Sequence, residues 1–124
     1  MGGTEWARLK AVIDVPLRRG GWYRVLSRTH LQTIVDVNGK SVAVPLPYVE
    51  VRTTPPGAWT VLRNPTVAAR TPKAFRPGYL VCPACQTRIP LPPNPVALQL
   101  CPRCSNSFPI AWDERYMEKE TTKV

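Results

Sequence analysis

The stretch TIVDVNGKSVAV, from Thr33 to Val44, contains two runs rich in β-branched residues, separated by Asn38 and Gly39. β-Branched side chains favour strands because they are stiff and pack well on a pleated surface. Asn and Gly both tolerate the positive φ angles of a type I′ turn, and Asn-Gly between two such runs is the strongest short-range signal for a hairpin. The sequence therefore predicts an antiparallel β-hairpin in the N-terminal half of the chain.

Further strands are predicted on both sides of this hairpin. They are Leu9–Leu17, Trp22–Ser27, Tyr48–Thr53 and Ala58–Arg63. Turn signals rich in glycine and proline separate them. The chain also contains 15 prolines in 124 residues. Because proline removes a backbone donor and breaks helix interiors, we expect an all-β protein with little helix.

Short strands at this spacing favour a small barrel or a sandwich. The strand count and turn spacing between Arg8 and Arg63 resemble those of the SH3-like small barrels, a group that includes Tudor-like and KOW-like modules. An OB-like barrel is the alternative. The resemblance implies a small β-barrel over residues 5–63.

The chain after residue 63 divides into three parts by composition. Residues 64–78 (NPTVAARTPKAFRPG) contain three prolines, three basic residues and no acid, which predicts an extended, basic, proline-rich linker. Residues 79–112 contain all four cysteines. Residues 113–124 are polar and terminal, so we expect them to form a tail.

The four cysteines form two pairs, Cys82-Pro83-Ala84-Cys85 and Cys101-Pro102-Arg103-Cys104. Two C-x-x-C pairs at this separation match the spacing of zinc sites. Zinc binds four thiolates in a tetrahedron at roughly 2.3 Å, and a tight turn presents both sulfurs of a pair to the same ion. We therefore predict one structural zinc ion. Iron bound by the same four ligands, or a disulfide or redox pair, are the alternatives.

The two cysteine knuckles resemble those of the zinc-ribbon family. Each is followed by a short predicted strand, 87–91 after the first and 107–111 after the second. Ribbons often place glycine directly after the second cysteine of a knuckle, where φ is positive, but this chain has Gln86 and Ser105 there. We expect Asn106 to supply the left-handed residue of the second knuckle. Four thiolates leave no open position on the metal, so its expected role is structural.

The net charge is +9, and no acidic residue occurs between Glu50 and Asp113. A basic body attracts polyanions, although ordinary solubility charge explains the same excess. The candidate contacts to nucleic acid or another polyanion are Arg18, Arg19, Arg63, Arg70, Lys73, Arg76, Arg88 and Arg103. Phe75 is the candidate for stacking on a base, with docking onto the barrel or a partner protein as the alternative. Trp22 and Trp59 are expected in the cores.

Motifs typical of enzymes are absent from the sequence. The only histidine, His30, lies in a predicted loop, and there is neither a glycine-rich phosphate loop nor a serine or metal-protease signature. We therefore expect a non-catalytic protein. Residues 1–10 lack the apolar core of a secretory signal, no stretch is long and apolar enough to span a membrane, and paired thiols favour a reducing compartment, so we expect the cytoplasm.

Two functions remain open from the sequence. The first is an adaptor that binds RNA, DNA or a nucleoprotein assembly related to the ribosome or transcription, since ribbons and SH3-like barrels both recur there. The second is an accessory subunit of a larger complex, whose basic stretch faces an acidic protein or an anionic membrane surface. The oligomeric state is not indicated.

Overall fold

The computed structural model describes residues 4–11, 13–63, 73–75, 78–114 and 116. The described part of the chain is all-β, as the sequence predicts, with ten short strands and two single-turn 3₁₀ helices. It divides into two compact units, Met1–Pro56 and Gly57–Val124.

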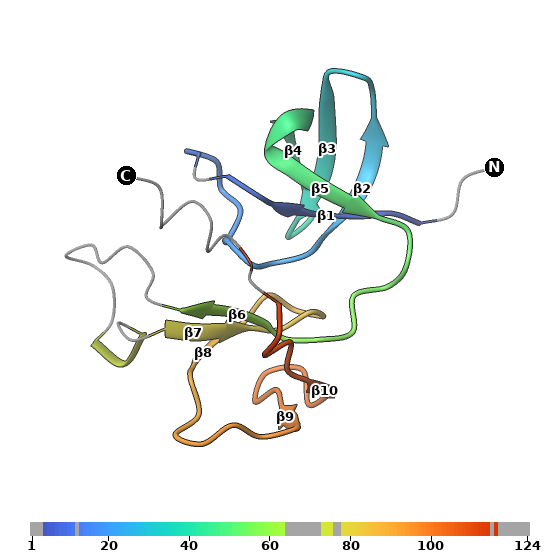
Figure 1. The fold of residues 1–124 in the computed structure, drawn as a ribbon. Helices are drawn as coiled ribbons and strands as arrows, with labels where there is room; N and C mark the ends of the chain where they lie inside the picture. Colours follow the sequence, from blue (N-terminus) through green and yellow to red (C-terminus); the bar gives the residue numbers. More distant parts are fainter. Residues whose placement is uncertain (1–3, 12, 64–72, 76–77, 115, 117–124) are drawn as a thin grey trace. The chain divides into compact units, whose positions relative to one another are not determined.

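The first unit contains a five-stranded antiparallel sheet in the order β4-β3-β2-β1-β5 (Figure 1). Its strands are β1 (Trp6–Leu9), β2 (Tyr23–Arg28), β3 (Gln32–Val37), β4 (Lys40–Pro45) and β5 (Val49–Arg52). The 3₁₀ helix η1 (Leu46–Tyr48) joins β4 to β5. Pro45 and Pro47 end the β4 strand as expected, and the chain then turns through η1, which the sequence analysis did not anticipate.

The predicted hairpin is confirmed. Val37 pairs with Lys40, so Asn38 and Gly39 alone form the turn. Their φ angles are 54° and 86°, both in the left-handed region that a type I′ turn requires. The Asp36 carboxylate accepts a hydrogen bond of 2.8 Å from the Gly39 N–H, which satisfies a backbone donor at the tip.

The strand expected at Leu9–Leu17 is displaced. The structure places β1 at Trp6–Leu9, and the following described residues up to Gly21 form no strand. β1 pairs with both β2 and β5, which makes it a central strand rather than an edge. Pro16 has no backbone donor for a ladder, so the apolar residues after Leu9 contribute side chains to the core instead, with Leu17 only 7% exposed.

The core of the first unit is built from small and aliphatic residues around Tyr23. Trp22 is also buried, as expected, and the guanidinium of the buried Arg8 lies 4.5 Å from the centre of its ring. Arg8 Nε donates to a Glu50 carboxylate oxygen at 2.9 Å. A buried guanidinium needs such a carboxylate to offset its lost hydration, so the pair fixes β1 against β5.

The second unit contains a three-stranded sheet in the order β6-β7-β8 and a two-stranded sheet of β9 and β10 (Figure 1). The strands are β6 (Thr60–Arg63), β7 (Gly78–Val81), β8 (Arg88–Pro90), β9 (Leu98–Leu100) and β10 (Ser107–Pro109), and η2 is Lys73–Phe75. β8 and β10 lie within the two strands expected after the cysteine knuckles, whereas β7 and β9 were not predicted.

The position of β6 differs from the expectation. The sequence analysis assigned residues up to Arg63 to the barrel, but β6 pairs with β7 from Thr60 opposite Val81 to Arg63 opposite Gly78. The pairing requires glycine at 78, because φ there is 142° and a Cβ atom would lie 2.5 Å from the Leu62 carbonyl oxygen. Most of the predicted linker, residues 64–72, 76 and 77, lies outside the described part of the chain.

Two hydrophobic clusters stabilise the second unit. The larger one surrounds Trp59, which is 0% exposed, and includes Cys82 and Cys101. The smaller one contains Leu62, Tyr79, Val81 and Tyr116. The sequence analysis placed Tyr116 in the polar tail, but its side chain is buried in this cluster.

Candidate metal centre

The first cysteine pair lies in a tight turn between β7 and β8. The Cys82 N–H donates to the Thr87 carbonyl at 2.9 Å, and the Gln86 N–H donates to the Cys82 carbonyl at 3.1 Å. These bonds close a loop that holds the sulfurs of Cys82 and Cys85 on the same side. Gln86 has a φ of 61°, so it occupies the left-handed position that ribbons often fill with glycine.

The second pair, between β9 and β10, repeats the same pattern residue for residue. The Cys101 N–H donates to the Asn106 carbonyl at 2.8 Å, and the Ser105 N–H donates to the Cys101 carbonyl at 2.9 Å. Ser105 has a φ of 64°. The left-handed residue is therefore Ser105 itself, and the expectation that Asn106 supplies it is wrong.

Backbone N–H groups point at the sulfur of the first cysteine in each pair. Ala84 N–H donates to Cys82 Sγ at 3.4 Å, and Arg103 N–H donates to Cys101 Sγ at 3.4 Å. Such bonds stabilise a thiolate more than a thiol, since they bring positive dipole ends to the negative sulfur. The turn geometry thus prepares both sulfurs to act as anionic ligands.

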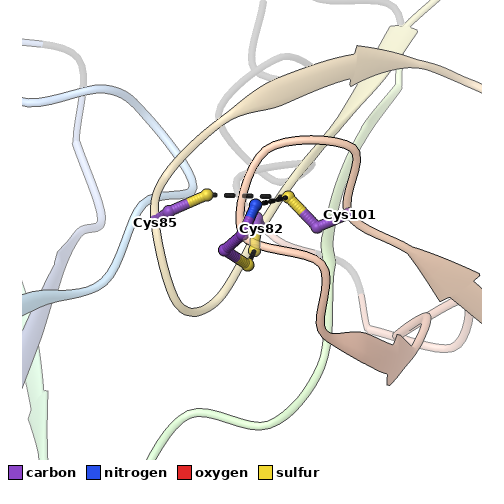
Figure 2. Close-up of side chains that lie close together, drawn as sticks. Cys82, Cys85 and Cys101 are labelled. Atoms are coloured by element: carbon purple, nitrogen blue, oxygen red, sulfur yellow. Dashed lines mark hydrogen bonds between the residues drawn. The ribbon is translucent and has the colours of Figure 1, made fainter.

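The two knuckles bring their sulfurs together across the unit. Cys82 Sγ lies 3.7 Å from Cys104 Sγ. Cys85 Sγ lies 3.6 Å from Cys101 Sγ, and Figure 2 shows this pair beside Cys82. All four sulfurs lie within 4.8 Å of one another, and none of the cysteines forms a disulfide. A tetrahedron with metal–sulfur bonds of 2.3 Å has edges of about 3.8 Å, so the cluster is positioned to hold a single metal ion.

A metal cation would offset the cost of charging this buried cluster. Cys82 and Cys101 are 0% exposed, and burial raises the pKa of the Cys82 thiol far above its ordinary value. At the more open Cys104, the backbone hydrogen bond from Asn106 lowers the pKa of the thiol to about 7. Four thiolates this close repel one another, and a metal cation removes both the repulsion and the cost of burying the charge.

Two polar side chains that the sequence analysis did not select contact the cluster. Thr87 Oγ1 lies 3.2 Å from Cys85 Sγ, and Asn106 Nδ2 donates to Cys104 Sγ at 3.5 Å. Each stands two residues after the second cysteine of its pair. This position in the sequence could have identified both residues, because the knuckle turn brings the second residue after each pair back beside the sulfur. Such neighbours orient metal ligands and tune their basicity.

Replacing Ser105 with glycine is expected to stabilise the metal-bound protein by about 1 kcal/mol. Ser105 is exposed and has a φ of 64°, so its Cβ is strained there, whereas glycine adopts this φ without strain. The measurement is the denaturant midpoint of zinc-saturated protein. Ser107→Gly is the control: it adds the same flexibility at an exposed serine of β10 whose φ is not positive, and it should destabilise. A loss of stability in Ser105→Gly would contradict the argument.

The predicted polyanion contacts belong to both units: Arg18 and Arg19 to the first, and the others to the second. Arg18, Lys73, Arg88 and Arg103 are exposed and Arg19 is half-buried, whereas Arg70 and Arg76 lie outside the described residues. Arg63 donates to the Trp112 carbonyl at 2.9 Å, and Arg88 lies over the rings of Phe75 and Tyr79. This hydrogen bond and these ring contacts hold both arginines against their own unit. Phe75 is half-buried, with its ring centre 5.5 Å from that of Tyr79, so it packs against the smaller cluster of its own unit.

Among the described residues, no helix is long and apolar enough to cross a membrane.

Comparison with known proteins gives no assignment for this arrangement. The sequence matches no family model and no curated protein, and its fold matches no solved structure.

Proposed function

We propose that the chain is a non-catalytic adaptor whose second unit is a zinc ribbon holding one structural Zn²⁺. The single observation that supports this most is the set of four sulfurs within 4.8 Å of one another. Zinc accepts four thiolates in a closed tetrahedral site, and such sites stabilise a fold and do no chemistry. Two knuckles with matching hydrogen bonds, each with a strand on either side, further support the ribbon assignment. Thiolate ligation also suits a reducing compartment such as the cytoplasm.

The first unit supports the adaptor proposal through its topology. A five-stranded antiparallel sheet in the order β4-β3-β2-β1-β5 is compatible with the SH3-like resemblance, which rests on strand count and turn spacing. Small barrels of this kind and ribbons serve mainly as binding modules. This argument is one of fold, so the partner has to come from the surface chemistry.

The charge of the chain favours nucleic acid as that partner. The net charge is +9, and no acid occurs from Val51 to Trp112. Lys73 and Arg103 are exposed predicted contacts on the second unit. Each cation that neutralises a phosphate releases a condensed counterion, so binding should be strong at low salt and weak at high salt.

Fluorescence anisotropy with labelled RNA and DNA tests this proposal. For the zinc-loaded protein, we expect micromolar binding at low salt that weakens steeply as salt is added. Lys73→Gln and Arg103→Gln should each weaken binding at all sequences and reduce the slope of log K against log[salt] by about 1. Lys40→Gln is the matched control, because Lys40 is an exposed lysine at the tip of the β3–β4 hairpin and outside the predicted set. No binding at low salt would refute polyanion recognition.

Exposed leucines on β9 favour a second candidate, contact with another protein. Leu98 and Leu100 are 62% and 57% exposed, and they stand two residues apart, so they share one face of the strand. An interface that centres on apolar anchors depends weakly on salt. The salt series therefore separates the two candidates.

A further inference from the structure

An open pocket of about 430 Å³ lies in the first unit, beside η1 and β5. One side of it is apolar and is formed by Leu46, Pro47, Val49 and Val51. The other side is charged and comes from the end of β1, the end of β2 and the turn between β2 and β3. The pocket is thus assembled from segments that are distant in the sequence, and none of its lining residues belongs to the cysteine cluster.

The charged side of the pocket carries an excess of positive charge. Its one acid, Glu50, already forms an ion pair of 2.8 Å with Arg8, and Arg28 forms one of 3.0 Å with Glu5. The other two charged or titratable lining residues are Lys10 and His30. Both are exposed, and among the described residues neither side chain has an ion-pair or hydrogen-bond partner. A ligand with negative charge finds one uncompensated cation here, Lys10, beside the imidazole of His30, which can supply a ring N–H donor.

The apolar side of the pocket coincides with a free edge of the sheet. Among the described residues, β5 is a terminal strand whose one partner is β1. The Lys10 N–H donates to the Tyr48 carbonyl at 2.9 Å, so these two residues form a hydrogen-bonded pair. Hydrogen-bonded and non-hydrogen-bonded pairs alternate along an antiparallel ladder. Arg8 and Glu50 therefore form the next hydrogen-bonded pair. The main-chain groups of Val51, one residue further, therefore point away from β1. They form a template for another extended chain.

We propose that this pocket binds an extended acidic peptide, which adds to β5 as a sixth strand. The main chain of the peptide pairs with the N–H and C=O of Val51. An apolar side chain of the peptide packs on Leu46 and Val49, and its carboxylates face Lys10 and His30. Main-chain pairing supplies affinity in this mode of recognition, and the side-chain contacts supply specificity.

The lining favours a peptide over nucleic acid. No Phe, Tyr or Trp lines the pocket, so the imidazole of His30 is the only lining ring on which a base can stack. A nucleic acid also has no counterpart to the alternating donors and acceptors of a β-strand edge. The excess of cations disfavours basic peptides in turn.

Selection from a library of random 12-residue peptides displayed on phage, against the immobilised full-length zinc-loaded protein, tests the proposal. We expect enrichment of peptides that combine Asp or Glu with β-branched residues. Failure to enrich any peptide, or enrichment of basic ones, would overturn the proposal. One enriched peptide is then labelled and its dissociation constant measured by anisotropy.

Two substitutions locate the binding. Lys10→Gln should raise the dissociation constant about threefold, the effect of one exposed ion pair, and Lys40→Gln on the opposite edge strand should leave it unchanged.

Val51→Pro removes the edge N–H and should raise the dissociation constant about fivefold. Val51→Thr is its control, because threonine retains the donor. A melting temperature for each variant shows that the protein is folded. Equal affinities in Lys10→Gln and Lys40→Gln, or displacement of the peptide by an oligo-dT strand at equal charge concentration, would contradict a peptide site.

Discussion

Replacing Cys101 with serine is expected to abolish zinc binding and to unfold the second unit. Cys101 Sγ is one of the four sulfurs of the site: it lies 3.6 Å from Cys85 Sγ and accepts hydrogen bonds from the N–H groups of Arg103 and Cys104. Serine is a far weaker zinc ligand than a thiolate. Structural zinc contributes an apparent binding free energy of about 10–16 kcal/mol at pH 7 in small domains. A hydrophobic core of this size rarely supplies more than about 5 kcal/mol, so the unit cannot replace the metal.

The measurement combines zinc content by mass spectrometry with NMR spectra of residues 57–63 and 78–114. We expect less than one zinc per chain and collapsed chemical-shift dispersion for these residues in the Cys101→Ser variant. Ser107→Ala is the control, because Ser107 is exposed and close in sequence but contributes no sulfur. A Cys101→Ser variant with one bound zinc and dispersed spectra would show that the four-thiolate site is wrong.

Truncating Trp59 to alanine should cost the zinc-bound second unit about 3–5 kcal/mol. The side chain is 0% exposed in the cluster that contains Cys82 and Cys101. The Trp59 N–H donates to the Pro109 carbonyl, and the Trp59 carbonyl accepts from the Ala111 N–H, so the two hydrogen bonds flank the β-bridge between Trp59 and Ile110. The indole N–H donates to the Gln99 carbonyl at 3.0 Å. Removing the ring therefore leaves a cavity beside the metal site and removes the indole hydrogen bond to the Gln99 carbonyl.

A graded variant separates these two contributions. Trp59→Phe keeps most of the apolar burial and loses the indole hydrogen bond, which should cost about 1–2 kcal/mol. Denaturant midpoints of zinc-saturated protein, followed by NMR signals of the second unit, give both values. A cost below about 1 kcal/mol for Trp59→Ala would mean that the ring contributes little to this core.

The features that local sequence determines were predicted well. The hairpin at Asn38-Gly39 forms because its turn dihedrals and its β-branched strands agree, and both signals lie within twelve residues. The cysteine cluster was recognisable for the same reason, since each C-x-x-C pair is a complete local turn. The all-β class also followed from proline content and strand patterns.

Features that depend on distant partners were predicted poorly. β6 has an ordinary strand sequence, and only its pairing with β7 across residues 64–77 shows that it belongs to the second unit. The strand expected from Leu9 onward begins instead at Trp6, because pairing with β5 favours that register. Strand propensity identifies a segment that can pair but does not identify its partner.

The pocket in the first unit could not be predicted for the same reason. Lys10 and His30 are ordinary surface residues in the sequence, and they line one pocket only because β1, β2 and β5 are neighbours in the sheet. The left-handed Ser105 was missed because residue preferences favour Asn106, whereas the hydrogen bonds of the knuckle fix the position.

X-ray absorption fine structure at the zinc edge of the purified protein tests the central claim most directly. The account predicts a strong zinc edge and a first shell of four sulfurs at about 2.3 Å, with no nitrogen or oxygen ligand. An iron edge in place of zinc, or a first shell with fewer than four sulfurs, would contradict it.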